Sequence, residues 1–318
     1  MRPQILYFLI TVLLTVLFGK PAIELLRRLK FGQSERAEGP QSHLKKQGTP
    51  TMGGAFFLLA LLISGAVACV FYTDMLPLLL VTVAMGIVGL IDDLIKIKVD
   101  KHGLRAWQKS LLQLVFAAAY VGWSMWQLNG SYGIDLVFFT WNMPGWLYAV
   151  IILAFFYYIT NCVNLTDGVD GLASSTVGVA AFALAFAFEF VLGDTTASIF
   201  SAMILAVCVG FLVYNRHPAK VFMGDTGSLA LGAAFSALMM RTGTPVLALL
   251  IGLIFVVEGL SVMIQVVVFK VTGKRVFRMT PIHHHFELGK WSETKIVNVF
   301  SLVTLLGAAA TVAILYYF

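Results

Sequence analysis

The chain of 318 residues is divided into ten apolar runs, most of them about as long as a membrane-spanning helix must be. The runs lie near residues 3–19, 52–72, 76–95, 110–128, 146–160, 172–192, 196–214, 227–241, 246–269 and 296–317. A helix needs roughly 20 mostly apolar residues to cross a hydrocarbon core of about 30 Å, whereas a β-barrel would show short alternating segments. Because 59% of the residues are hydrophobic and only 12% are charged, a soluble fold would lack the polar side chains to cover its surface. We therefore predict an all-α polytopic integral membrane protein with about ten transmembrane helices, forming a single domain over 1–318.

Basic residues are concentrated in alternate loops between these runs. Loops 20–51, 96–109, 215–226 and 270–295 hold 20 of the 22 Lys and Arg residues and all six His residues. Because cytoplasmic loops of membrane proteins carry an excess of Lys and Arg, we predict that these loops are cytoplasmic and that both termini are extracellular. The net charge of +6 then reflects orientation and attraction to anionic lipid, so we expect membrane lipid, and no nucleic acid, as a partner.

Two adjacent acids, Asp92 and Asp93, end the third apolar run. They lie next to lysines at the predicted membrane surface, so one interpretation is a solvated helix terminus. The other is a general base or a metal ligand, because closely spaced carboxylates raise one another's pKa or recruit Mg²⁺.

A polar segment, NCVNLTDGVDG at 161–171, follows the fifth run and contains no basic residue. Asp167 and Asp170 are three residues apart and would share a helical face, while Gly168 and Gly171 would let a ligand approach the backbone closely. A capping turn before the next helix explains one of these acids, but not the whole set, so we favour a ligand site.

A glycine-rich turn around Asp225, VFMGDTGSLALG, opens the eighth run. Free backbone N–H groups at such a helix start suit a phosphate, and the adjacent carboxylate can hold the Mg²⁺ that neutralises it. The same pattern is typical of an ordinary helix cap, and the functional interpretation depends on its position on the same membrane face as the other acids.

The remaining polar motifs are also predicted on that face. His283, His284 and His285 are consecutive, a spacing that does not match zinc ligands, and we favour them as hydrogen-bond partners of a phosphate or a sugar. KKQGTPTMGG at 45–54 is a cationic, flexible turn suited to anions. A membrane-surface anchor explains its lysines but not TPTMGG.

Acids for Mg²⁺, glycine-rich helix starts and cationic groups together predict phosphoryl chemistry on a nucleotide-type substrate with a membrane-resident partner. The chain contains no GKS or GKT motif, so ATP-driven transport has no support. The competing class is a transporter or flippase, which would distribute acids along a pathway through the membrane, where the main acid here is Glu258.

Five motifs give the chain a specific resemblance. KKQGTPTMGG, GLIDDLIK, NCVNLTDGVDGLA, VFMGDTGSLALG and TPIHHHFE occur in the order and spacing of the phospho-N-acetylmuramoyl-pentapeptide transferases, a family of the polyprenyl-phosphate N-acetylhexosamine-1-phosphate transferase superfamily. The resemblance covers almost the whole chain. It implies transfer of phospho-MurNAc-pentapeptide from UDP-MurNAc-pentapeptide to undecaprenyl phosphate at the bacterial plasma membrane, with Mg²⁺ as cofactor and lipid I and UMP as products. Sister enzymes that use UDP-GlcNAc are the alternative.

The resemblance also implies roles for individual residues. Asp225 and Asn164 would bind Mg²⁺, Asp225 also being catalytic, and Asp92 would be the base that deprotonates the lipid phosphate, with Asp93 beside it. The residues implied for substrate binding are Asp167, Asp170, Phe222 and Gly224 at the uridine and pyrophosphate, Lys46, Thr51 and Lys109 at the phosphates, and His283, His284 and His285 on the sugar-peptide side. The resemblance leaves two questions open: whether the protein forms a homodimer, and whether the reaction is a direct displacement or proceeds through a phospho-enzyme.

Overall fold

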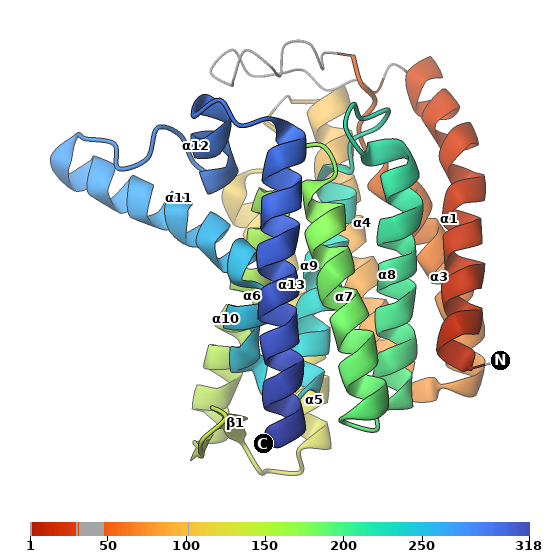
Figure 1. Ribbon diagram of the computed structural model, residues 1–318, viewed down its shortest axis with the longest axis vertical. Coiled ribbons are helices and arrows are strands. Elements are labelled where there is room, and N and C mark those ends of the chain that lie inside the picture. The colour runs from red at the N-terminus through yellow and green to blue at the C-terminus, as the bar shows by residue number, and fades with distance from the viewer. Residues whose placement is uncertain (1, 30, 32–47, 101) are drawn as a thin grey trace.

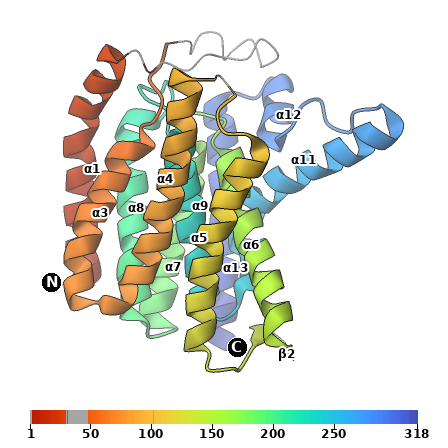
Figure 2. The same cartoon turned by 180° about the vertical axis from the view of Figure 1, so that it is seen from behind.

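The computed structural model describes residues 2–29, 31, 48–100 and 102–318, and this part of the chain forms a bundle of ten long helices (Figures 1 and 2). The long helices are α1 Pro3–Arg28, α3 Gly54–Phe71, α4 Leu76–Lys98, α5 Ala106–Gln127, α6 Gly145–Thr166, α7 Leu172–Phe190, α8 Thr195–Asn215, α9 Gly224–Arg241, α11 Leu253–Thr272 and α13 Glu293–Tyr317. The short elements are η1 Thr73–Met75, η2 Pro245–Leu247, α10 Ala248–Ile251, α12 Ile282–Leu288 and the antiparallel strands β1 Gly133–Asp135 and β2 Thr140–Asn142. The prediction of an all-α polytopic membrane protein is confirmed.

Eight of these helices have the length and apolar composition of membrane spans, with η1 and α4 forming one span. The other two long helices, α5 and α9, are less apolar because each carries polar or small residues that serve the interior. In α9, every residue from Thr226 to Met239 is buried. This helix therefore faces protein on all sides, which explains why hydropathy alone understates it.

Glycines allow the neighbouring helices to approach α9 closely. A Cβ atom at Gly89 of α4 would lie 2.1 Å from the backbone oxygen of Asp225, and one at Gly54 of α3 would lie 2.2 Å from the amide nitrogen of Gly227. On α9 itself, a Cβ atom at Gly232 would lie 2.6 Å from the backbone oxygen of Thr160 in α6. The close crossing of α4 and α9 brings the end of α4, with its two acids, to the start of α9.

Both chain ends lie at the end of the bundle opposite α12 (Figure 1). The β1–β2 hairpin lies at that same end, and Ile134 of β1 packs there on Val121, Tyr148 and Ile152. The opposite end, which carries α12 and the start of α9, holds the residues that the sequence singles out for chemistry.

The predicted ninth span, 246–269, is not one helix, so this part of the prediction is wrong. The chain forms η2 and α10, ends that helix at Gly252, and begins α11 in a new direction. A glycine is a natural place for such a break, since it disfavours the helix interior. The first half of α11 is packed on the bundle up to Ser261, and its second half projects away from the other helices (Figures 1 and 2).

The fifth span is longer than predicted. Helix α6 continues to Thr166, so Asn161 and Asn164 lie on a helix and not in a loop. The half-buried Asn161 has a partner in the neighbouring helix, because its Nδ2 donates to Gln113 Oε1 of α5 at 2.7 Å. The end of α6 thus carries amide side chains inward, toward α5 and α9.

Candidate active site

Two carboxylates and two ammonium groups meet where α4, α5 and α9 converge. Lys96 Nζ lies 2.8 Å from Asp92 Oδ2 and 2.6 Å from Asp225 Oδ2. Lys109 Nζ, from the first turn of α5, repeats this arrangement at 3.2 and 2.6 Å. The Asp92 side chain is 2% exposed, and its other oxygen, Oδ1, accepts a hydrogen bond from the amide of Leu104 at 2.7 Å. Interpreting Asp92 as a solvated helix terminus is therefore wrong, because it is a buried carboxylate with the partners that burial requires.

Asp93 points the other way and caps helix α9. Its carboxylate accepts hydrogen bonds from the amide of Asp225 at 3.1 Å, and from the amide and hydroxyl of Thr226 at 2.9 and 2.7 Å. Gly224 has φ +72°, and a Cβ atom there would lie 2.6 Å from Asp93 Oδ2, so a larger residue would push this carboxylate away. The first amides of α9 are thus bound by a side chain, and the prediction that they are free for a phosphate is wrong at these two residues.

Helix α6 brings Asn164 to the same cluster. Its Nδ2 donates to Asp225 Oδ1 at 2.8 Å and to Ser228 Oγ at 2.7 Å, so the amide oxygen is the atom left for a metal. Mg²⁺ prefers carboxylate and carbonyl oxygens. Asp225 Oδ2 lies 2.6 Å from the Nζ atoms of both Lys96 and Lys109, so this oxygen binds positively charged groups. The predicted metal ligands Asp225 and Asn164 are therefore in contact, and their carboxylate and amide oxygens are of the kind that Mg²⁺ prefers.

The segment that enters α3 lies beside the segment that enters α9. The amides of Gly53 and Gly54 donate to the backbone oxygens of Phe222 and Met223, each at 2.8 Å, and the amide of Phe222 donates to Pro50 at 2.8 Å. Thr51, on this segment, is therefore held next to Phe222 and Gly224. Lys46 lies outside the described residues.

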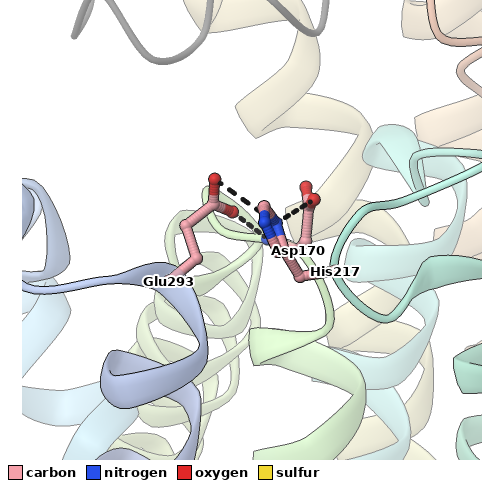
Figure 3. Close-up of side chains that lie close together, drawn as sticks. All are labelled: Asp170, His217 and Glu293. Atoms are coloured by element: carbon pink, nitrogen blue, oxygen red, sulfur yellow. Dashed lines mark hydrogen bonds and ion pairs between the residues drawn. The ribbon is translucent and has the colours of Figure 1, made fainter.

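Asp170 belongs to a second cluster, separate from the lysine-bridged one. His217 Nδ1 lies 3.0 Å from Asp170 Oδ2 and 3.7 Å from Glu293 Oε1 of α13 (Figure 3). Asp170 and Asp167 lie in the turn between α6 and α7, so the prediction that they share a helical face is wrong. In the described part of the chain, this is the one group of three His, Cys, Asp or Glu residues whose ligand atoms all lie within 4.8 Å of one another.

Hydrogen bonds already account for this second cluster. Asp170 Oδ2 also accepts from the amide of Ala219 at 3.0 Å, and Glu293 Oε2 accepts from the amide of Asp170 at 3.1 Å. The cluster joins the α6–α7 turn, the α8–α9 loop and the start of α13, which fixes the turn that carries Asp167 and Asp170.

The three histidines of α12 have three different partners. His283 is buried and its Nδ1 lies 3.0 Å from Glu258 Oε1. His284 Nδ1 lies 2.6 Å from Glu287 Oε2. His285 Nδ1 accepts from the amide of Arg278 at 3.2 Å. The rings of His283 and His284 lie close together, with centroids 4.1 Å apart, and His284 and His285 are the two that are partly exposed.

Several residues of the site were not predicted from the sequence. Lys96 had a local signal, since it lies four residues after Asp92 on the same helix, a spacing at which opposite charges meet. Ser228 and Thr226, on the first turns of α9, read as ordinary helix-cap residues. His217 and Glu293 had no local signal, because their partner Asp170 is 47 and 123 residues away in sequence.

Comparison with known proteins identifies the family of this chain. Residues 75–243 match the model of glycosyl transferase family 4, and residues 46–58 match phospho-N-acetylmuramoyl-pentapeptide-transferase signature 1. The phospho-N-acetylmuramoyl-pentapeptide-transferase of Halalkalibacterium halodurans is 46% identical over 310 residues, which cover 96% of this chain and 94% of the relative. The enzyme of the same name from Staphylococcus aureus is 45% identical over 309 residues, which cover 94% of this chain and 95% of the relative. With identity of this extent along nearly its whole length, the chain belongs to the phospho-N-acetylmuramoyl-pentapeptide-transferase family.

Proposed function

We propose that this protein transfers phospho-MurNAc-pentapeptide from UDP-MurNAc-pentapeptide to undecaprenyl phosphate, which yields lipid I and UMP. An oxygen of the lipid phosphate attacks the sugar-linked phosphorus of the donor. The bond from that phosphorus to the bridging oxygen breaks, and UMP leaves with the bridging oxygen and its electron pair. The observation that carries the proposal is the pair of acids bridged by Lys96 and Lys109 at the α12 end of a membrane bundle, in a chain of this family.

The two lysines are suited to hold the phosphates of both substrates. Each is partly exposed, at 36% for Lys96 and 20% for Lys109, while the acids behind them are more buried. Ammonium groups held by buried carboxylates are oriented before the substrate arrives, which is the condition for effective stabilisation of charge in a transition state.

Mg²⁺ is the proposed cofactor, with Asp225 and the amide oxygen of Asn164 as its ligands. When bound, it would neutralise negative charge on the donor pyrophosphate, as metal ions do in phosphoryl transfer. Asp93 and Ser228 hold these two ligands from behind, through the Asp225 amide and the Asn164 amide group.

The remaining predicted residues are assigned by their place around this centre. Asp92 is proposed as the base for the lipid phosphate. Asp167, Asp170, Phe222 and Gly224 are proposed to line the nucleotide side, with Thr51 and Lys46 beside them at the phosphates, and His284 and His285 are proposed to face the sugar and peptide.

The active end of the bundle is proposed to face the cytoplasm of a bacterial cell. Arg27 and Arg28 in the last turn of α1, and Lys96 and Lys98 in the last turn of α4, support this orientation by the positive-inside rule. The termini would then be extracellular. A homodimer is compatible with this arrangement and is not required by it.

The experiment that tests the function is a comparison of two donors. Purified protein is incubated with undecaprenyl phosphate, Mg²⁺ and either UDP-MurNAc-pentapeptide or UDP-GlcNAc, and UMP release is measured. We expect UMP with the first donor. Release with UDP-GlcNAc alone would assign the chain to the sister reaction, and release with neither donor would remove the proposal.

A further inference from the structure

A buried acid and a buried histidine form a pair away from the lysine-bridged cluster. Glu258 of α11 and His283 of α12 are both 0% exposed, and Glu258 Oε1 lies 3.0 Å from His283 Nδ1. The backbone amide of His283 lies 3.5 Å from the other carboxylate oxygen. These two contacts fix the plane of the ring, and an ionised carboxylate at this place would accept a hydrogen bond from the proton of Nδ1.

The opposite edge of the ring is pressed against the turn between α6 and α7. A Cβ atom at Gly168 would lie 2.2 Å from His283 Nε2, a distance that no real side chain could keep. Nε2 is buried and has no hydrogen-bond partner among the described residues. The ring therefore supports this turn by packing against Gly168, and not by a hydrogen bond from Nε2.

Gly168 is flanked by residues of the proposed nucleotide side. It directly follows Asp167, it is two residues before Asp170, and it is four residues after Asn164. Contacts therefore run from α11 through one carboxylate and one imidazole ring to the turn that carries these side chains.

We propose that Glu258 and His283 are positioning residues of the transfer reaction, which hold the Asp167–Asp170 turn in place for the uridine diphosphate part of the donor. The inference rests on the proposed function. It gives His283 a supporting role behind the donor site, in place of direct contact with the sugar and peptide, and it gives Glu258 a function through His283 alone.

Replacing Glu258 in two ways separates orientation from charge. Glu258→Gln keeps an oxygen that accepts from Nδ1 and so keeps the ring in place, whereas Glu258→Ala removes the acceptor. For Glu258→Ala we expect UDP to bind about 10-fold or more weakly and kcat/KM for the UDP-linked donor to fall about 10- to 100-fold, because small displacements of positioning groups have effects of this size. For Glu258→Gln we expect both values within about threefold of wild type, a tolerance well below that range.

Ser261→Ala is the matched control. Ser261 is on the same helix and 2% exposed, but its hydroxyl donates to the backbone oxygen of Glu258 and contacts no residue of α12 in the described hydrogen bonds. We expect wild-type UDP affinity and donor kcat/KM for this variant. The KM for undecaprenyl phosphate is expected to stay unchanged in all three variants. The outer half of α11 is apolar and exposed, so a general disturbance of this helix would instead change the KM for the lipid substrate.

His283→Asn provides a second route if Glu258→Ala does not fold, as judged by thermal unfolding in detergent. The asparagine amide can still donate to Glu258, but the ring edge at Gly168 is lost, so the same weakening of UDP binding is expected. Wild-type protein that releases no UMP would remove the proposed function. If the wild type releases UMP but folded Glu258→Ala or His283→Asn binds UDP normally, this inference alone is overturned. Equal losses for Glu258→Gln and Glu258→Ala would also overturn it, and would indicate that the charge of Glu258 matters instead.

Discussion

Asp93 of α4 accepts hydrogen bonds from both the amide and the hydroxyl of Thr226 in α9, at 2.9 and 2.7 Å. The same carboxylate accepts from the amide of Asp225, so the orientation of the proposed metal ligand depends on an acid that forms no ion pair with Lys96 or Lys109 among the described salt bridges. A carboxylate at a helix N-terminus is also favoured by the helix dipole.

Two substitutions of Thr226 test this capping role. Thr226→Ser keeps the hydroxyl and should retain near wild-type activity and melting temperature, whereas Thr226→Val keeps the shape and removes the hydrogen bond. Hydrogen bonds to charged groups contribute about 1.5–3 kcal/mol, so we expect Thr226→Val to lower the free energy of unfolding by about that amount and to reduce UMP release. Unfolding in detergent and UMP release measure the two effects. Equal behaviour of the two variants would show that the hydroxyl has no such role.

Asp225→Asn should abolish turnover and leave the helical bundle intact. The change removes one negative charge at the proposed Mg²⁺ ligand, and loss of a group that stabilises transition-state charge costs about 10²-fold or more in rate. UMP release, with circular dichroism as the check on folding, is the measurement. Near-normal activity of a folded variant would exclude Asp225 as an essential metal ligand.

Asp92→Asn tests the proposed base through the pH profile. The second ionisation of a phosphate monoester lies near pH 6, so at higher pH the lipid phosphate loses its proton without help. If Asp92 removes that proton, activity lost at neutral pH should return in part as the pH rises from about 6 to about 9.5, and Asp225→Asn should show no such recovery.

The geometry supplies a specific alternative for Asp92. Its Oδ2 lies 2.8 Å from Lys96 and 3.2 Å from Lys109, so it also holds both lysines in place. A loss that is equal at every pH would assign Asp92 to this holding role and exclude it as the base.

Gly168→Ala should reproduce the loss of His283 support. The new methyl group would meet His283 Nε2, which must then move away from the turn, and we expect donor kcat/KM to fall about 10-fold or more. Gly122→Ala in α5 is the control, since a Cβ atom there meets nothing within 4 Å and alanine favours a helix. Full activity of Gly168→Ala would mean that the ring and the turn can separate without cost.

Cysteine labelling tests the proposed orientation in the membrane. Ser131 is exposed at the end of the bundle that carries the termini, and His102, with a side chain 84% exposed, is on the α4–α5 loop at the active end. In intact cells, a membrane-impermeant thiol reagent should label Ser131→Cys and not His102→Cys, with wild type as the control for the native cysteines. The reverse pattern would place the active end outside.

The sequence predicts the spans well because apolar length is a local property. The prediction is poorer for segments whose polar or small residues pack against or hydrogen-bond to other helices in the interior of the protein. Helix α9 is modestly apolar yet fully surrounded, and α6 continues through Asn161 because Gln113 of α5 accepts its amide hydrogen. Periodicity also could not show that 246–269 would divide at Gly252, since both halves are apolar.

The site was predictable as a set of residue types and not as a set of pairs. The motifs identify Asp92, Asp93 and Asp225 as candidate residues. They do not show that Asp92 and Asp225 pair with lysines while Asp93 caps α9, because this depends on the direction of each side chain. Among the pairs of the lysine-bridged cluster, only that of Lys96 with Asp92 is local. The pairing of Lys96 with Asp225 spans 129 residues, and Asp170 meets Glu293 across 123, so both depend on the completed bundle.

This separation has a consequence for how the protein is made. Thr226 is 133 residues beyond Asp93, so during synthesis α4 enters the membrane well before the helix that its second acid will cap exists. Lys96 is on α4 itself, one turn from Asp92, and travels with it. Helix α4 therefore already contains the cation that pairs with Asp92, whereas Asp93 has its Thr226 partner only after α9 has been inserted. The insertion of α9 is thus the step that completes the active end.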